Sequence, residues 1–128
     1  ACDVCQNKKP CVQKDDMASI LQKMIDADVI VIATPVYFYT MCAQLKTLID
    51  RTYARYTEIK KKDFYFILTA ADKRKKNMER AIESFRAFTY CLEKPVEKGI
   101  ICATGVWNKG DIKGSRKMKE AYDAGLNA

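Results

Sequence analysis

The succession of apolar and polar positions predicts helices and strands that alternate along the chain. An uninterrupted apolar run, typical of a parallel strand buried on both faces, occupies residues 29–33, and further strands are predicted over residues 64–70 and 99–104. Apolar residues recur at helical spacing over residues 15–27, 42–56, 76–92 and 115–125. Strands separated by helices imply βαβ units, so the sequence predicts an α/β fold with a parallel sheet, three strands and four helices.

The segment that follows the first apolar run is a candidate binding loop. Ligands of open α/β sheets bind beyond the carboxyl ends of the strands. Three aromatic rings would stand at that edge, beside exposed backbone amides, and would suit a flat, conjugated ligand. Alternatively, the rings pack the next helix onto the sheet. The residues of this segment are Thr34, Pro35, Val36, Tyr37, Phe38 and Tyr39.

Length and composition indicate a single globular domain over residues 1–128. Apolar residues make up 48% of the chain and charged residues 30%, which is ordinary for a globular protein. No apolar run approaches the roughly 20 residues that span a bilayer, and no signal-peptide pattern is present. We therefore expect a cytoplasmic protein with no membrane partner.

The chain is basic, with a formal net charge of +7. The positive charge is concentrated in residues 60–62 and 73–76. No zinc-finger spacing or RNA-recognition motif accompanies it, so we expect no nucleic-acid partner. A solvated basic face is the simpler interpretation of both clusters.

Cysteines near the start of the chain form a second candidate site. Cys2, Cys5 and Cys11 have C-x2-C-x5-C spacing, and thiolates two residues apart in a loop can ligate one metal or cluster. Three interpretations remain open: ligands of a 4Fe-4S cluster in the complete protein, a thiol group that binds no metal, and a zinc site completed by another chain. The other cysteines, Cys42, Cys91 and Cys102, are expected to be small buried residues.

Three segments together resemble a known family, the flavodoxin-like, NADPH-dependent FMN reductases, and within it the iron-sulfur flavoproteins. The segments are CDVCQNKKPCVQKDDM, ADVIVIATPVYFYTMCAQLKTLIDR and GIICATGVWNKGDIKGSRKMKEAYDAGLN. The resemblance implies a flavodoxin-like sheet with helices on both faces. In the family, a strand and a Ser/Gly-rich loop that binds the FMN phosphate precede these segments, and the chain contains neither. We therefore expect a sheet that is incomplete at its N-terminus and, because a partial sheet exposes an edge, a homo-oligomer.

The resemblance also implies an activity and a set of site residues. FMN would take hydride from NAD(P)H and pass electrons to a small-molecule or protein acceptor, with no catalytic side chain. Residues 34–39 would border the flavin, and the loops after the other strands would complete the pocket with Ala71, Asp72, Gly105, Val106 and Trp107. The basic segment 73–76 would either bind an anion, such as the extra phosphate of NADPH, or point into water. The alternatives are a truncated, non-catalytic interaction module that does not retain FMN, and a metal-dependent basic binding module.

Overall fold

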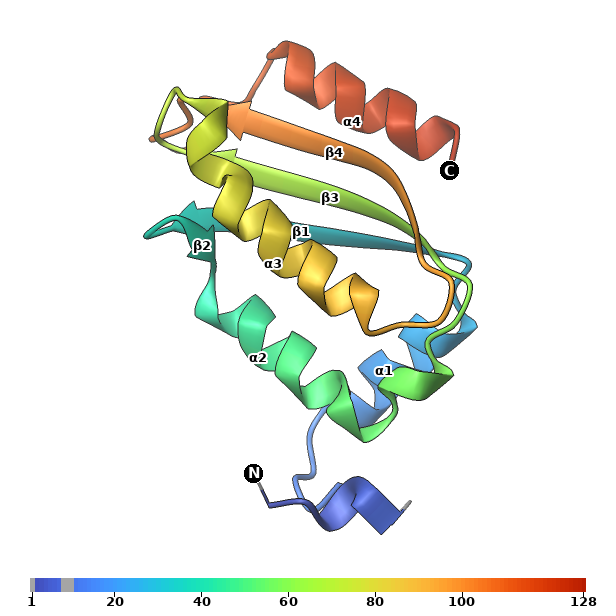
Figure 1. The fold of residues 1–128 in the computed structure, drawn as a ribbon. Helices are drawn as coiled ribbons and strands as arrows, with labels where there is room; N and C mark the ends of the chain where they lie inside the picture. Colours follow the sequence, from blue (N-terminus) through green and yellow to red (C-terminus); the bar gives the residue numbers. More distant parts are fainter. Residues whose placement is uncertain (1, 8–10) are drawn as a thin grey trace.

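The structure, a computed structural model, describes residues 2–7 and 11–128. A 3-10 turn at Val4–Asn7 precedes the main elements, which Figure 1 shows in chain order. These are α1 (Met17–Asp26), β1 (Val29–Tyr37), β2 (Thr40–Met41), α2 (Ala43–Arg51), β3 (Asp63–Ala70), α3 (Glu79–Tyr90), β4 (Val96–Thr104) and α4 (Arg116–Leu126). Further 3-10 turns follow α2, at Thr52–Ala54 and Tyr56–Glu58, and precede α3, at Lys75–Met78.

The strands form one sheet in the order β2-β1-β3-β4. The three long strands β1, β3 and β4 are parallel, with Ile32 opposite Phe66 and Leu68 opposite Cys102. The two-residue strand β2 runs back along the end of β1 and pairs antiparallel with it. The predicted α/β fold is confirmed, with a fourth, short strand among the described residues that the apolar runs did not indicate.

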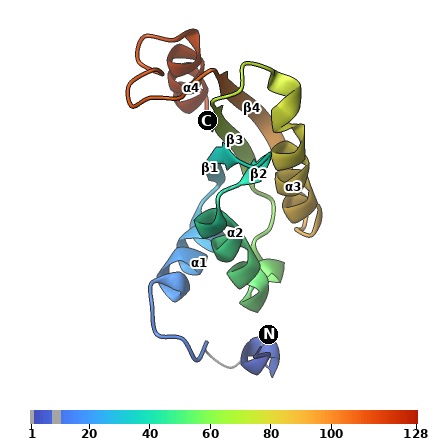
Figure 2. The same cartoon turned by 90° about the vertical axis from the view of Figure 1, so that its left-hand side faces the viewer.

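One face of the sheet carries the hydrophobic core. Alternate residues of β3 are buried, and α3 packs on them, with the fully buried rings of Phe66 and Phe85 5.1 Å apart between centroids. The first helix adds Met17 and Leu21 to the same cluster. Figure 2 shows α3 and α4 on opposite sides of the sheet. An aromatic pair of this kind contributes about 0.5–1.5 kcal/mol beyond the burial of its area, so it stabilises the packing of α3 on β3.

The other face of the sheet is covered unevenly. Helix α4 lies against β4, where Ile101 and Ala103 are buried, but the side chain of Val31 on β1 is 55% exposed and Ala33 is exposed as well. The prediction that residues 29–33 are buried on both faces is therefore wrong for this chain. The physical reason is that no helix in the described part of the chain covers β1 on that side.

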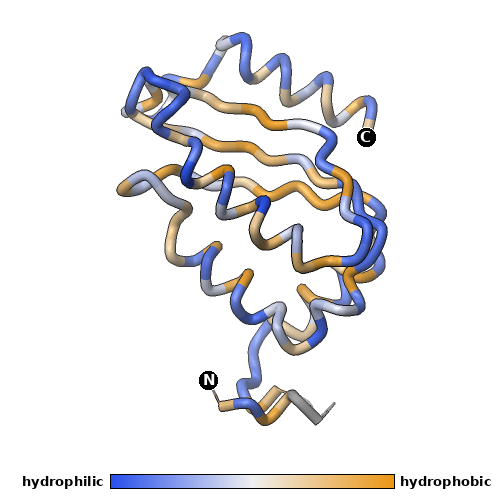
Figure 3. Tube along the Cα trace, in the orientation of Figure 1, coloured by the Kyte–Doolittle hydropathy of each residue, from blue (hydrophilic) through white to orange (hydrophobic). Residues whose placement is uncertain are grey.

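The helix predictions hold, with shifted ends. Ser115 caps α4 as expected, and its Oγ accepts a hydrogen bond from the Met118 amide at 3.3 Å. At the start of α1 it is the carboxylate of Asp15 that accepts from the Met17 amide, at 3.1 Å. The described helices include none that is long and apolar enough to cross a membrane. In Figure 3, the segment leading from β3 into α3 is conspicuously hydrophilic beside the apolar strands.

Candidate functional site

The end of β1 is a tight aromatic hairpin. The predicted loop 34–39 is wrong for its first four residues, because β1 continues to Tyr37 and only Phe38 and Tyr39 form the turn before β2. Both turn residues have positive φ, 47° and 68°. Two-residue hairpin turns with two positive φ angles normally use Asn-Gly, and a non-glycine residue in the left-handed region costs roughly 1–2 kcal/mol.

The aromatic rings of this hairpin are exposed, and its backbone is strained. Phe38 is 98% exposed, and Tyr37 and Tyr39 are also largely open to solvent. Strained backbone persists where the surrounding structure imposes it, and it clusters at ligand-binding positions. Contiguous exposed apolar groups are one mark of an interaction site. The hairpin turn is therefore the strongest candidate for direct ligand contact.

Thr34 has a structural role at this edge. Its side chain is 3% exposed, its hydroxyl donates to the Pro35 carbonyl at 2.7 Å, and it accepts a hydrogen bond from the Cys42 amide at 3.0 Å. It thus fixes the start of α2 against the end of β1. Pro35 and Val36 are half-buried between it and the exposed rings.

Cys42 is not the buried residue that the sequence suggested. It is half-buried and stands just before α2, where the neighbouring Thr34 side chain and then the backbone of Leu45 lower the pKa of its thiol. Helix N-termini favour thiolate in this way. Of the other two, Cys102 is buried as predicted, but Cys91 is exposed near the end of α3.

We expect the rate at which iodoacetamide modifies Cys42 to reach half its maximum at a pH below 9.0, the ordinary pKa of a thiol. The sign follows from the lowered pKa, because the reactive thiolate is then populated at a lower pH in the folded protein. Cys102 serves as the internal control: burial raises its pKa, so it should react only after unfolding. Peptide mass spectrometry across a pH series measures both, and a Cys42 midpoint at or above 9.0 would contradict the assignment.

The loops after β3 and β4 are joined to each other. The Gly105 amide donates to the Asp72 carbonyl at 3.2 Å, and the Val106 amide donates to the Ala70 carbonyl at 2.9 Å. Gly105 has φ +72°, a conformation that glycine adopts without strain. The structure thus brings together the two predicted loop segments, and Ala71 lies exposed between them.

The carboxylates of Asp72 and Asp111 order these loops by accepting hydrogen bonds from residues within them. Asp72 accepts from the Arg74 side chain and amide and from the Asn77 amide group, and the Arg74 contact above all holds the pKa of Asp72 well below its usual range. Asp111 accepts from the backbone amides of Asn108 and Trp107, at 2.7 and 2.9 Å, which lowers its pKa. Neither group is placed to act as a base, and the Trp107 ring stays 81% exposed.

The hairpin turn meets the start of α3 across a hollow. The hollow has a volume of about 430 Å³ and is lined by Tyr39, Lys76, Asn77 and Arg80. The Arg80 guanidinium carbon lies 5.7 Å from the centroid of the Tyr39 ring, a cation–π distance. Sequence reasoning missed Asn77 and Arg80, although the spacing of four between Lys76 and Arg80 was a usable signal that they share a helical face.

The cysteine segment lies apart from this edge, beyond α1 (Figure 1). Cys2 and Cys11 are exposed and Cys5 is half-buried. Within residues 2–7 and 11–128, no three His, Cys, Asp or Glu side chains are grouped to hold a metal ion. Arg51 contacts this segment, with bonds of 2.6 and 3.0 Å to Asp15 and a 3.9 Å contact to the Cys11 sulfur. Metal binding by the three cysteines stays a prediction.

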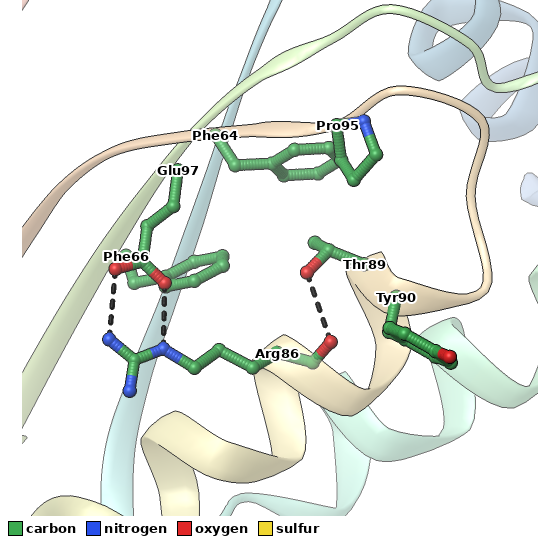
Figure 4. A pocket seen from close by; sticks show the side chains of 7 residues that line it. All are labelled: Phe64, Phe66, Arg86, Thr89, Tyr90, Pro95 and Glu97. Carbon is green, nitrogen blue, oxygen red and sulfur yellow. Dashed lines mark hydrogen bonds and ion pairs between the residues drawn. The ribbon is translucent and has the colours of Figure 1, made fainter.

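A second hollow, of about 200 Å³, lies between the end of α3 and the first half of β4, as Figure 4 shows. Its charged groups are already paired. Arg86 donates to both carboxylate oxygens of Glu97, at 2.8 and 2.9 Å, and to Glu83 at 2.8 Å. With no free charge and with its Phe64 and Phe66 rings buried, this hollow is a poorer candidate than the carboxyl edge.

Fold and site together define a flavodoxin-like α/β protein. The structure of the Trp repressor binding protein from Bacillus subtilis shares this fold with a TM-score of 0.72, at 23% identity over 83% of this chain and 72% of that one. The family model of the NADPH-dependent FMN reductases matches residues 2–95, and the chain belongs to that family.

The curated relatives are iron-sulfur flavoproteins. One from Archaeoglobus fulgidus is 51% identical over 51 residues, which is 40% of this chain and 25% of the relative. Another from the same organism is 32% identical over 130 residues, covering 94% of this chain and 66% of the relative. The first relatives are therefore matched over only about a quarter of their length.

Proposed function

We propose that this chain belongs to an FMN-dependent oxidoreductase that takes electrons from NAD(P)H and passes them to an acceptor. The observation that carries the proposal is the hairpin turn of Phe38 and Tyr39. Its two positive φ angles maintain exposed rings at the carboxyl edge of a flavodoxin-like sheet. A protein that maintains such strain at a ligand edge is expected to use it in binding.

The residues at this edge suit the ring system of a flavin. Tyr37, Phe38 and Tyr39 offer aromatic faces for an isoalloxazine, and Trp107 offers another on the loop after β4. Gly105 permits close approach of backbone to a ligand. The described residues include no Ser/Gly-rich loop for the flavin phosphate, so the proposal for this chain concerns recognition of the ring.

Bound FMN would supply a hydride acceptor that needs no protein acid or base. The chain's own residues then have three tasks: the turn residues hold the ring, Thr34 fixes the hairpin against α2, and Asp72 orders the neighbouring loop. The low pKa of Asp72 keeps it ionised and hydrogen-bonded at neutral pH. Because the described cysteines are not grouped as cluster ligands, no electron route through iron is proposed.

The test is the anaerobic visible absorption spectrum of the purified chain with added FMN, before and after NADPH. The proposal expects a shift of the flavin bands on binding, followed by bleaching with NADPH. An FMN spectrum that the protein leaves unchanged would contradict the proposal. It would favour the alternative of a flavodoxin-like module that does not retain FMN.

A further inference from the structure

Helix α4 carries an apolar stripe that is open to solvent. Met118, Tyr122 and Leu126 recur at a spacing of four, so they lie in one row along the helix. Each is between 50% and 68% exposed. The apolar stripe of a helix normally faces the core of its own protein, but α4 lies against β4 and none of its residues is buried. Exposed apolar stripes of this kind are one mark of a surface that binds another protein.

The position of α4 leaves this stripe accessible. In Figure 1 the helix lies at the margin of the molecule, beyond β4, and Figure 2 shows it on the opposite side of the sheet from α3. Apolar and polar residues alternate along the helix in Figure 3. The stripe is also separate from the hairpin turn of Phe38 and Tyr39, so a molecule that covers it need not block the carboxyl edge of β1.

The charges beside the stripe can be exchanged at little cost. Lys119 and Asp123 share one flank of the stripe, and their side chains, both open to solvent, form a 3.2 Å ion pair within the helix. Exposed pairs at this spacing contribute little to stability, so each partner is available to a second molecule. Glu120 differs, because Arg116 and Lys117 both hold it.

We propose that α4 binds α4 of a second copy of this chain, with the two helices antiparallel and a twofold axis at Tyr122. In such an interface, if residue i contacts residue j, then j also contacts i. The stripe has this symmetry, because Met118 and Leu126 lie four residues before and four residues after Tyr122. Met118 of each copy would contact Leu126 of the other, with the two Tyr122 rings at the centre. Tyrosine is enriched at interfaces because its ring is apolar and its tip is polar.

The same axis brings opposite charges together. It places Asp123 of one copy level with residue 121 of the other, two residues from Lys119. At a rise of about 1.5 Å per residue, the two charged residues are then about 3 Å apart along the helix axis. The symmetry repeats the contact, so Lys119 and Asp123 would form two ion pairs between the copies. This charge complementarity is the reason to assign the stripe to a second copy in this orientation.

The contact is small, and the inference goes beyond the proposed function. One pair of helices covers less than the roughly 1,200 Å² of a standard interface, so we expect a weak dimer that forms at high protein concentration. The surface differs from the open sheet edge, from which the sequence predicted a homo-oligomer. No flavin or nucleotide is needed for it.

The test is sedimentation velocity of the whole chain, with a reductant to prevent disulfides and without flavin. Over about 10 µM to 1 mM, the range of weak association, we expect the mean mass to rise from monomer towards dimer. Tyr122→Glu should keep the chain monomeric, because it places two carboxylates at the twofold axis. The matched control is Tyr90→Glu, at another exposed tyrosine on α3, which should associate as the wild type does.

Two charge reversals test the orientation of the helices. Lys119→Glu and Asp123→Lys should each weaken self-association about tenfold, because each replaces two attractions by two repulsions. An equimolar mixture of the two variants should associate as the wild type does, since opposite charges then meet again in both contacts. A role within one helix alone predicts no recovery on mixing.

Three results would overturn the proposal: a chain that stays monomeric at every concentration, a dimer that persists in Tyr122→Glu, and a mixture of the charge variants that associates no better than either variant alone. A dimer that persists in Tyr122→Glu would place the interface elsewhere, such as at the open sheet edge. Because the samples contain no flavin, none of these results bears on the proposed function, and a failure of flavin binding leaves this interface standing.

Discussion

Phe85→Ala is expected to lower the free energy of unfolding by about 3–5 kcal/mol, the range for removing a large aromatic side chain from a core. Phe85 is fully buried on α3, and its ring lies 5.1 Å from that of Phe66 at an interplanar angle of 45°. This pair connects the helix to the middle of the sheet, and truncation would leave a cavity there. Urea unfolding followed by far-UV circular dichroism measures the loss.

Tyr90→Ala is the matched control, because Tyr90 ends the same helix and is 88% exposed. We expect a change within about 0.5 kcal/mol for this surface position. If Phe85→Ala does not fold, Phe85→Leu provides the measurable case, with a smaller loss of about 1–3 kcal/mol. Equal stability of Phe85→Ala and Tyr90→Ala would show that the core is not where the structure places it.

We expect the double variant Phe38→Asn, Tyr39→Gly to raise the free energy of unfolding by about 1–2 kcal/mol, because this type of turn favours Asn-Gly. The gain comes from relieving two positive φ angles of 47° and 68°. Loss of the Arg80 contact to Tyr39 offsets part of it, by about 0.5–1 kcal/mol. The same variant should lose flavin affinity, because it lacks the two rings that we propose to contact the flavin. Urea unfolding of the double variant measures the gain.

Lys61→Gly provides the comparison for the double variant. Lys61 also has positive φ, 53°, in the turn before β3, away from the hairpin. The Lys61→Gly variant should have a higher free energy of unfolding than the wild type, with a smaller gain than the double variant. Its affinity for flavin should be unchanged. A double variant that is less stable than the wild type would mean that the turn is not strained, and the main argument for a ligand at this edge would be lost.

The regular elements were readable from the sequence because their patterns are local. Helical spacing predicted all four helices, α1 to α4, and apolar runs predicted β1, β3 and β4. The exposure of Val31 was not predictable, since it depends on which helices cover the sheet and not on the strand itself. The extension of β1 was missed for a different reason: a turn made of Phe38 and Tyr39 lacks the Asn or Gly that would signal a hairpin.

The sequence predicted only those parts of the candidate site that lie in the loops directly after the strands. Loops after parallel strands meet at one edge, so Asp72 and Gly105 were expected together and are linked by a hydrogen bond. The contact between Tyr39 and Arg80 joins residues 41 positions apart, and no local pattern indicates it. The grouping of Cys2, Cys5 and Cys11 rested on spacing and on the family resemblance, and neither fixes where three side chains of a loop meet.

A fluorescence titration of riboflavin with the chain tests the central claim most directly. Riboflavin carries the flavin ring without the phosphate, and stacking on aromatic side chains quenches its emission. We expect saturable quenching by the wild-type chain, weakened about tenfold or more in the Phe38→Asn, Tyr39→Gly variant, since stacking of a base on an aromatic side chain is worth roughly 1–3 kcal/mol. Absence of quenching, or equal quenching by both proteins, would contradict it.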